Sequence, residues 1–301
     1  MNVRKRAVLA VAALVLALSA VVYAILGRSP GFLDVRGPYL GQAPPGTQAK
    51  LFAPSIVPHD LHSATVFDPD GQSVYWKEMD ANRFSVSERV GNRWTQPRVV
   101  SLGMPWFGLD DPCFSPDGQR LFFTSWRPVR WYRPLPHKER IWYVEKQPRG
   151  WSRPRPVGDA VNAMSLHWQL SVASSGAIYF TSEGDIYRSS LDRGQYGVPE
   201  RLADAVNSEY REGTPYIAPD ESYLVFSSNR HEENQGTYDL YVSYRLADGS
   251  WSEADNLGPT VNSTAQEMCP AVSPDGQYLF FLRNAETSRV YWIDSQIIQQ
   301  E

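Results

Sequence analysis

Cysteine is scarce in this sequence. The 301 residues include only Cys113 and Cys269, too few for a disulfide framework. A single bridge, a reactive thiol and two small buried residues all remain open for the pair. No cysteine follows the apolar N-terminal run directly, so the lipid-attachment pattern of a bacterial lipoprotein is missing.

Excess positive charge and the common nucleotide and hydrolase motifs are also missing. The 29 Lys and Arg residues are outnumbered by 33 Asp and Glu, which gives a formal net charge of −4. Without a basic run the chain is a poor candidate for nucleic-acid binding. It has no G-x-S-x-G elbow and no phosphate-binding glycine loop, which argues against a serine hydrolase and a nucleotide-binding enzyme.

The N-terminus contains a long uncharged stretch. Residues 7–26 are mostly aliphatic and, as a helix, would span the hydrocarbon core of a bilayer. Arg4, Lys5 and Arg6 precede the run and favour an N-terminus on the cytoplasmic side. We therefore expect a single-pass inner-membrane anchor over 1–28, a Pro/Gly-rich tether over 29–49 and an exported domain over 50–301. A cleaved signal peptide is the alternative.

The exported part contains an internal repeat marked by a turn. The tetrad DPDG occurs at 68–71 and SPDG at 115–118 and 273–276, with degenerate copies at 173–176 and 218–221. Proline presets the first central residue of a turn, and glycine accepts the positive φ that follows. Five units of about fifty residues are therefore predicted.

Each unit continues with short strands. A strand with a bulky apolar centre follows every tetrad, for example RLFFTS at 120–125 and YLVFSS at 223–228, and a second strand comes after it. Four units then carry a further strand that an aromatic residue opens, at Trp94, Trp151, Tyr196 and Trp251. Four antiparallel strands per unit, repeated radially, predict an all-β, five-bladed β-propeller.

The last unit lacks its outermost strand, and the missing segment lies at the N-terminus. Val157, Leu202 and Leu257 each precede the first residue of an innermost strand by ten positions, and Phe52 precedes His62 by the same distance. Residues 51–57 are therefore predicted to complete blade 5. Closing the ring in this way removes open sheet edges.

The fourth unit carries a recognisable motif series. It has an N-S-x-x-x-E start at 207–212, F-S-S-x-R at 226–230, Y-D-L-Y at 238–241 and W-S-x-x-x-N-L at 251–257. In these motifs the chain resembles the WD-like propeller repeats of the TolB-like group of bacterial exported proteins, over about residues 50–300. The resemblance implies an extracytoplasmic propeller without implying one activity. In the third unit Ser174-Ser175 replaces Pro-Asp, which leaves that turn's geometry open.

The spacing also predicts a ring of polar residues at one mouth of the central channel. These residues are His62, Asp110, His167, Glu212 and Glu267, with a one-residue discrepancy at Asp110, where the turn count gives Leu109. His62, His167, Glu212 and Glu267 form a candidate divalent-metal site, since imidazole and carboxylate ligands suit such ions. A metal-free polar ligand is a second interpretation. A third is that the carboxylates cap neighbouring backbone N–H groups.

A long loop is expected on the same face. Residues 126–140 combine arginines with two Trp and one Tyr, and guanidinium and aromatic groups recognise sugars and carboxylates. Arg130, Trp131 and Arg133 are its candidate ligand contacts. The alternative is a solvated loop whose aromatic residues pack on their own blade.

These features predict a membrane-tethered module that binds a protein or glycan in the periplasm through the channel mouth. A docking propeller whose channel another protein occupies is a related hypothesis. The alternative from another class is a glycan-active hydrolase or metal-dependent lyase, which needs paired carboxylates about 5–10 Å apart. Side chains that point into one accessible cavity would favour the enzyme, and capping by backbone amides would favour the binding module.

Overall fold

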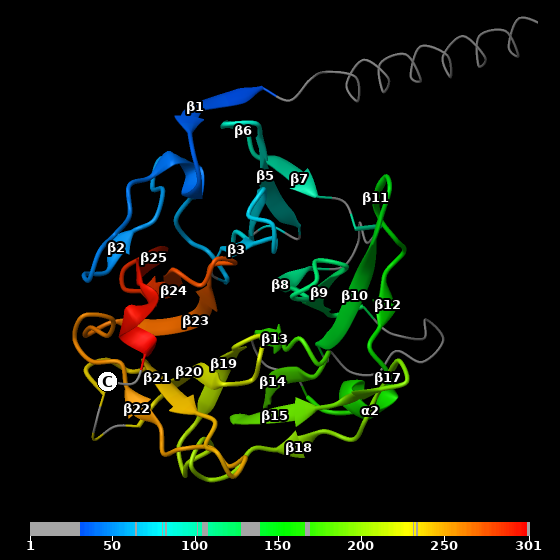
Figure 1. The fold of residues 1–301 in the computed structure, drawn as a ribbon, viewed down its shortest axis with the longest axis vertical. Helices are drawn as coiled ribbons and strands as arrows, with labels where there is room; N and C mark the ends of the chain where they lie inside the picture. Colours follow the sequence, from blue (N-terminus) through cyan, green and yellow to red (C-terminus); the bar gives the residue numbers. More distant parts are fainter. Residues whose placement is uncertain are drawn as a thin grey trace, which may run out of the picture.

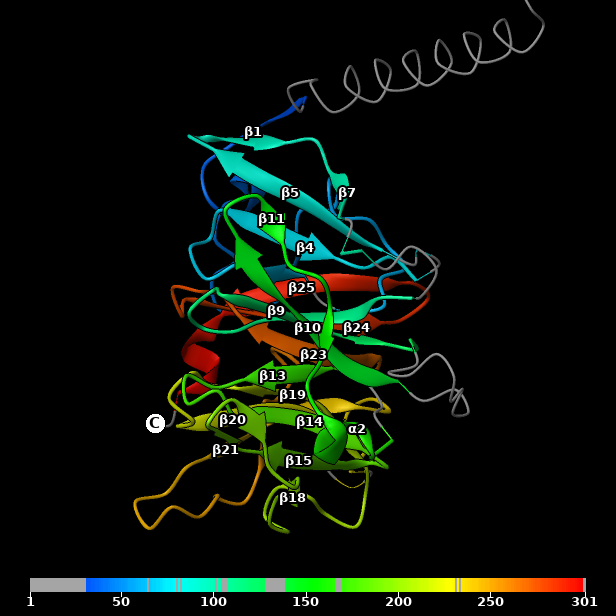
Figure 2. The same cartoon turned by 90° about the vertical axis from the view of Figure 1, so that its right-hand side faces the viewer.

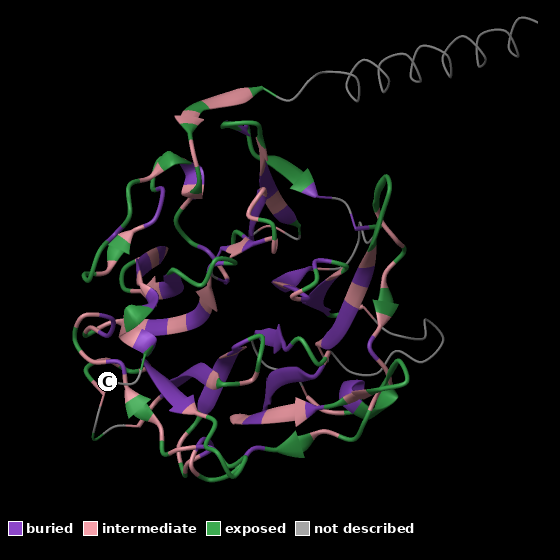
Figure 3. Ribbon diagram, in the orientation of Figure 1, coloured by how far each residue is buried: buried purple, intermediate pink, exposed green. Residues whose placement is uncertain are grey.

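A computed structural model describes residues 31–63, 65–79, 81, 83–100, 102–103, 108–127, 139–165, 169–230, 232 and 234–299. Five antiparallel β-sheets surround a central axis, as predicted (Figure 1). In the edge-on view the strands of successive blades run along that axis (Figure 2). Buried residues concentrate in the inner and middle strands, and exposed residues lie towards the outer rim (Figure 3).

The blades are built from consecutive strands that follow one another from the inner strand outward. Blade 1 contains β3 (Val66–Phe67), β4 (Ser73–Trp76), β5 (Phe84–Val90) and β7 (Arg98–Val100), with β6 (Arg93–Thr95) beside β5 and β1 (Phe32–Arg36) beside β6. Blade 2 contains β8 (Asp110–Phe114), β9 (Arg120–Ser125), β10 (Arg140–Gln147) and β12 (Arg155–Pro156), with β11 (Gly150–Trp151) beside β10.

Blade 3 contains β13 (Leu170–Val172), β14 (Ile178–Ser182), β15 (Asp185–Ser189) and β18 (Glu200–Arg201), with a hairpin of β16 (Leu191–Asp192) and β17 (Gln195–Tyr196). Blade 4 contains β19 (Glu212–Ile217), β20 (Tyr223–Ser228), β21 (Asp239–Tyr244) and β22 (Asp255–Asn256). Blade 5 contains β23 (Gln266–Val272), β24 (Tyr278–Asn284), β25 (Ser288–Asp294) and β2 (Lys50–Leu51). The short helices are η1 (Tyr39–Gly41), α2 (Asp159–Asn162) and η2 (Ser295–Ile298).

The N-terminal strand closes the ring, which confirms the predicted closure. Strand β2 pairs with β25, and the Phe52 N–H donates to the Val290 carbonyl at 2.9 Å. Val157, Leu202 and Leu257 make the equivalent bond to the third strand of their own blades. The ten-residue spacing therefore identified equivalent positions, although the regular strand ends at Leu51 instead of Val57.

All five repeat turns have the same geometry. In each, the residue at the glycine position donates its N–H to the carbonyl three residues earlier. The degenerate third turn keeps this bond, since Gly176 bonds to Ala173 at 2.9 Å. Replacing proline by Ser174 also restores an N–H, which donates to the Pro219 carbonyl of blade 4 at 2.7 Å. The departure from the repeat thus adds a contact between blades.

The segment predicted as a tether differs from the expectation. From Gly31 onward it lies on the propeller: β1 pairs with β6, and the Trp94 indole N–H donates to the Gly37 carbonyl at 2.7 Å. Leu40 is 2% exposed, and the Tyr39 ring lies 5.3 Å from that of Phe67. Composition alone suggested an extended linker because its few apolar residues have no period, yet they fill the junction of blades 5 and 1.

The predicted membrane anchor over residues 1–28 lies outside the described residues and stays a prediction. Within the part of the chain that the structure describes, no helix has the length and apolar character needed to cross a bilayer.

Candidate functional site

The start of each innermost strand faces one mouth of the channel, and four of the predicted residues lie there in two different roles. Asp110 opens β8, Glu212 opens β19, Glu267 lies at the start of β23, and His62 precedes β3. His167, Arg130, Trp131 and Arg133 lie outside the described residues, so their predicted roles stay predictions.

Glu212 and Glu267 are internal caps. The Glu267 carboxylate accepts the Ser263 backbone N–H at 3.1 Å and the Ser263 hydroxyl at 2.6 Å, and Glu212 makes the same two bonds with Ser208. Both residues are at most 1% exposed. This is the capping interpretation weighed for the N-S-x-x-x-E motif.

An arginine completes each cap. Arg283 donates through Nε to Glu267 at 2.6 Å and through a terminal nitrogen to the Val261 carbonyl at 2.8 Å. In blade 4, Arg230 lies 3.5 Å from Glu212 and donates to the Val206 carbonyl at 2.9 Å. With their oxygens engaged in this way, these two carboxylates do not fit the predicted metal site. Across the described residues no three His, Cys, Asp or Glu side chains are grouped to hold a metal ion.

The discrepancy in blade 2 is settled by backbone conformation. Asp111, Thr214 and Cys269 all have left-handed φ, at 50°, 46° and 54°. Each of them precedes a proline and lies six residues before the third residue of the turn tetrad in its own blade. Leu109 is therefore the equivalent of Glu212 and Glu267, and Asp110 is one position further along. The recurring X-Pro pair was a signal in the sequence that could have fixed this register.

Blades 1 and 2 carry a charged cluster instead of a cap. Lys77 Nζ lies 2.8 Å from Asp110 Oδ1, and His62 Nδ1 lies 3.4 Å from the same oxygen. Lys77 is 3% exposed, while the His62 side chain is 29% exposed. The His62 Nδ1 and Asp110 Oδ1 atoms lack hydrogen-bond geometry, so the ring lies against the carboxylate without a hydrogen bond between these two atoms. Lys77 was not predicted from the sequence. A signal was present, because the residues at the equivalent position of the other blades are all uncharged: Thr124, Ser182, Ser227 and Leu282.

Asp111 lies beside this cluster. Its carboxylate accepts from the Thr124 hydroxyl at 3.2 Å, and it is 3.9 Å from His62 Nδ1. Burial is the main cause that raises the pKa of Asp111 to about 7, and the neighbouring Asp110 charge adds to it. The group therefore exchanges a proton near neutral pH.

A third carboxyl group comes from the end of the long loop. Glu139 accepts the Trp126 indole N–H at 2.9 Å, a bond that joins the two ends of the loop. Burial, and secondly the charge of Asp111, raise the pKa of Glu139 to about 7. Strand pairing places both loop ends beside Asp110 at the channel mouth, since Asp110 pairs with Thr124 and Ser125 pairs with Arg140. Glu139 was not singled out from the sequence, because a single acid in a basic loop has no distinguishing pattern.

A cavity of about 340 Å³ opens at this mouth. It is lined by Leu61, His62, Met79, Asp111, Tyr238, Gln266, Met268, Cys269, Leu282 and Asn284. The lining mixes polar and apolar groups, the usual composition of a small-ligand site.

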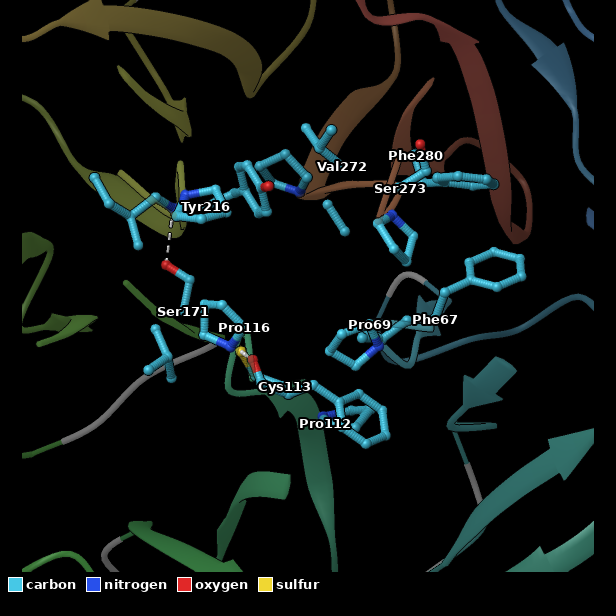
Figure 4. Close-up of a pocket in the computed structure, with 18 of the residues that line it drawn as sticks. Phe67, Pro69, Pro112, Cys113, Pro116, Ser171, Tyr216, Val272, Ser273 and Phe280 are labelled. Atoms are coloured by element: carbon cyan, nitrogen blue, oxygen red, sulfur yellow. Dashed lines mark hydrogen bonds between the residues drawn. The ribbon is translucent and has the colours of Figure 1, made fainter. Parts of the chain in front are cut away.

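Gln169 separates this cavity from one at the other end of the channel. Its side-chain amide crosses from blade 3 to donate to the Pro270 carbonyl of blade 5 at 2.7 Å. Beyond it lies the turn-face cavity of about 200 Å³, which prolines and aromatic residues surround (Figure 4). Cys113 lines that cavity and Cys269 lines the mouth cavity, and the two cysteines are not joined in a disulfide.

The chain was compared with known proteins. No family model matches it, and no curated protein sequence matches it either. Among solved structures, a putative TolB from Agrobacterium tumefaciens is similar, with a TM-score of 0.53 and 20% identity over 81% of this chain and 80% of the other.

An endo-arabinase from Bacteroides thetaiotaomicron has a TM-score of 0.51 and 14% identity, covering 78% of this chain and 93% of its own. A luciferin-regenerating enzyme has a TM-score of 0.50 and 10% identity, covering 81% and 94%. The predicted resemblance to TolB-like propellers is thus confirmed at the level of the fold.

Proposed function

We propose that this chain is an exported ligand-binding propeller, tethered to the inner membrane, whose channel mouth holds a polar periplasmic ligand on the side of blades 1 and 2. The ligand is a glycan or a segment of a protein. The membrane location is inferred from residues 1–28, and the periplasmic side is inferred from the similarity to TolB.

The observation that carries the proposal is the contrast between sectors of the ring. Blades 4 and 5 satisfy their leading carboxylates internally, through the Ser208 and Ser263 contacts of Glu212 and Glu267. Blades 1 and 2 replace this cap with His62, Lys77, Asp110 and Asp111, where Lys77 pairs with Asp110 and the His62 ring lies 3.4 Å from the same carboxylate. A local departure from a stabilising repeat is expected at a functional site. Polar side chains that replace the stabilising cap lower stability, so a function explains why they are kept.

The chemistry of the mouth suits hydroxyl or amide groups. Carboxylates accept hydrogen bonds from O–H and N–H donors, and the partly exposed imidazole of His62 supplies a further polar contact. Leu61 and Met268 in the same cavity provide apolar surface for a sugar face or a peptide side chain. Arg130, Trp131 and Arg133 are proposed as further contacts, since the described ends of their loop lie at this mouth.

A binding screen with the full-length protein in detergent tests the proposal. Glycan and peptide arrays are expected to identify a ligand whose affinity falls at least tenfold in His62→Asn and Asp110→Asn. The matched control is Glu253→Gln, which changes an exposed carboxylate far along the chain and is expected to leave affinity unchanged. Binding that survives both mouth variants would place the ligand elsewhere and reject this site.

A second candidate function is glycan hydrolysis or elimination at the same mouth. The specific observation in its favour is the pairing of His62 with Asp110 next to Asp111, a carboxyl group with pKa about 7 that can donate a proton at neutral pH. Turnover of 4-nitrophenyl glycosides or of array-positive glycans, lost in Asp111→Asn, would establish it. Tight binding of the same glycans without any product between pH 5 and 9 would exclude catalysis and support the binding function.

A further inference from the structure

The turn-face cavity has walls that all five blades contribute. Pro69, Pro116, Pro219 and Pro274 come from the repeat turns, and Pro112 and Pro270 come from inner strands. Figure 4 shows three of these rings, Pro69, Pro112 and Pro116, around one space with three aromatic residues, Phe67, Tyr216 and Phe280. Since proline has a fixed φ and the turns share one geometry, the walls are rigid before any ligand arrives.

The lining of this cavity is uncharged. None of the side chains that the structure places around it is an acid, a lysine, an arginine or a histidine. Two of its polar side chains are already engaged: the Ser171 hydroxyl accepts the Ile217 N–H at 3.0 Å, and Gln169 donates to Pro270. A charged ligand would lose its hydration here without gaining an oppositely charged partner, so the cavity selects neutral, mainly apolar molecules.

The size of the cavity limits the ligand to one ring. Its volume of about 200 Å³ is somewhat larger than the roughly 150 Å³ apolar cavity that accommodates benzene, and smaller than the roughly 300 Å³ at which drug-sized sites begin. Gln169 and Pro270, joined by their hydrogen bond, both line this cavity, and we expect this contact to limit how far a longer molecule extends towards the mouth cavity. The aromatic residues in the wall favour an aromatic ring over an aliphatic one, because ring pairs add to the gain from burial.

We propose that the turn-face cavity is a binding site for a free, uncharged, single-ring aromatic molecule. This site is separate from the channel mouth and does not depend on the function proposed there. An aromatic side chain of a partner protein has the same ring chemistry, and an amino-acid amide probe distinguishes it from a free molecule.

The test uses ligand-observed NMR titration of the full-length protein in detergent. Benzyl alcohol and toluene are expected to bind at millimolar concentration or below. Methylcyclohexane is expected to bind severalfold more weakly, and benzylamine, which has the same ring with a positive charge, at least tenfold more weakly. Equal affinity for all four compounds would overturn the proposal, since it would indicate partition into apolar surface or detergent.

Two variants that change the cavity in opposite directions locate the binding. Ala271 lines the cavity, so Ala271→Leu should fill part of it and weaken benzyl alcohol binding at least tenfold. Gln169→Ala removes the inner end and should allow 2-naphthol, which the wild type excludes, to bind. Val198→Ser, on the exposed surface, should change neither affinity.

If neither Ala271→Leu nor Gln169→Ala changes the binding of any ring, the cavity is not the site. Denaturation curves establish that both variants are folded before the comparison is made. The last measurement compares N-acetyl-phenylalaninamide with benzyl alcohol. If the amide binds more tightly, the natural ligand is an aromatic side chain of a partner protein and the proposal is overturned. Weaker binding supports it.

Discussion

The side chain of Gln169 in blade 3 donates a 2.7 Å hydrogen bond to the Pro270 carbonyl of blade 5, across the central channel. These two blades are not neighbours in the ring, so this contact ties together sheets that share no edge. The backbone N–H of Gln169 also donates to the Asp111 carboxylate of blade 2. One residue thus connects three blades across the channel.

Gln169→Ala should therefore lower stability. Gln169 is 9% exposed, and its removal leaves the Pro270 carbonyl without this donor, at a cost of about 1–3 kcal/mol. Urea denaturation at pH 7 measures the change. Gln195→Ala, which alters an exposed residue of the β16–β17 hairpin, serves as the control. Equal stability of the two variants would show that the cross-channel bond contributes little.

The buried Asp111 carboxyl should make stability depend on pH. Its pKa rises from 3.8 to about 7 on folding, so the folded state retains a proton that the unfolded chain releases near pH 4. Ionisation of Asp111 consequently opposes folding, and its unfavourable contribution grows from about pH 4 to pH 7, to a total on the order of 4 kcal/mol.

Asp111→Asn removes this effect while keeping an oxygen acceptor for Thr124. The stability of the variant relative to wild type should increase between pH 4.5 and pH 7.5 in urea denaturation. The exposed Asp192→Asn should show no such trend. A difference between Asp111→Asn and wild type that is constant with pH contradicts the assigned titration.

The cap in blade 5 should be structural. Glu267→Gln keeps the shape of the side chain but removes the charge that pairs with Arg283, and the pair is fully buried on the glutamate side. A loss of about 2–4 kcal/mol is expected, measured by thermal and urea unfolding, against little change for the exposed Glu253→Gln. Binding at the mouth should persist in the folded fraction, and its loss there would return Glu267 to the ligand site.

Ring closure should depend on Phe52. This side chain is 1% exposed and its ring lies 5.0 Å from Phe280 and 5.2 Å from Trp292. Phe52→Ala should cost about 3–5 kcal/mol because the cavity left behind cannot collapse fully. Leu246→Ala, at a 44% exposed position, is the comparison. Similar unfolding midpoints for both would mean that the N-terminal segment does not hold blade 5 closed.

The repeat in the sequence determined the architecture of this protein. Five turn tetrads specified five blades, since proline, aspartate and glycine favour one turn locally. The spacing from Phe52 to His62 identified the closing strand, because every blade places these two positions alike. These inferences succeeded because they depend on residues close together in the chain or on repetition.

Only the tertiary structure decided which polar residues are structural and which form a site. Glu212 and His62 occupy equivalent positions, yet one is capped by Ser208 and the other meets Asp110 from the next blade. Lys77 likewise finds its charged partner across a blade boundary, and Gln169 reaches Pro270 more than a hundred positions away. Burial and Coulomb interactions depend on those distant neighbours, which a local pattern does not contain.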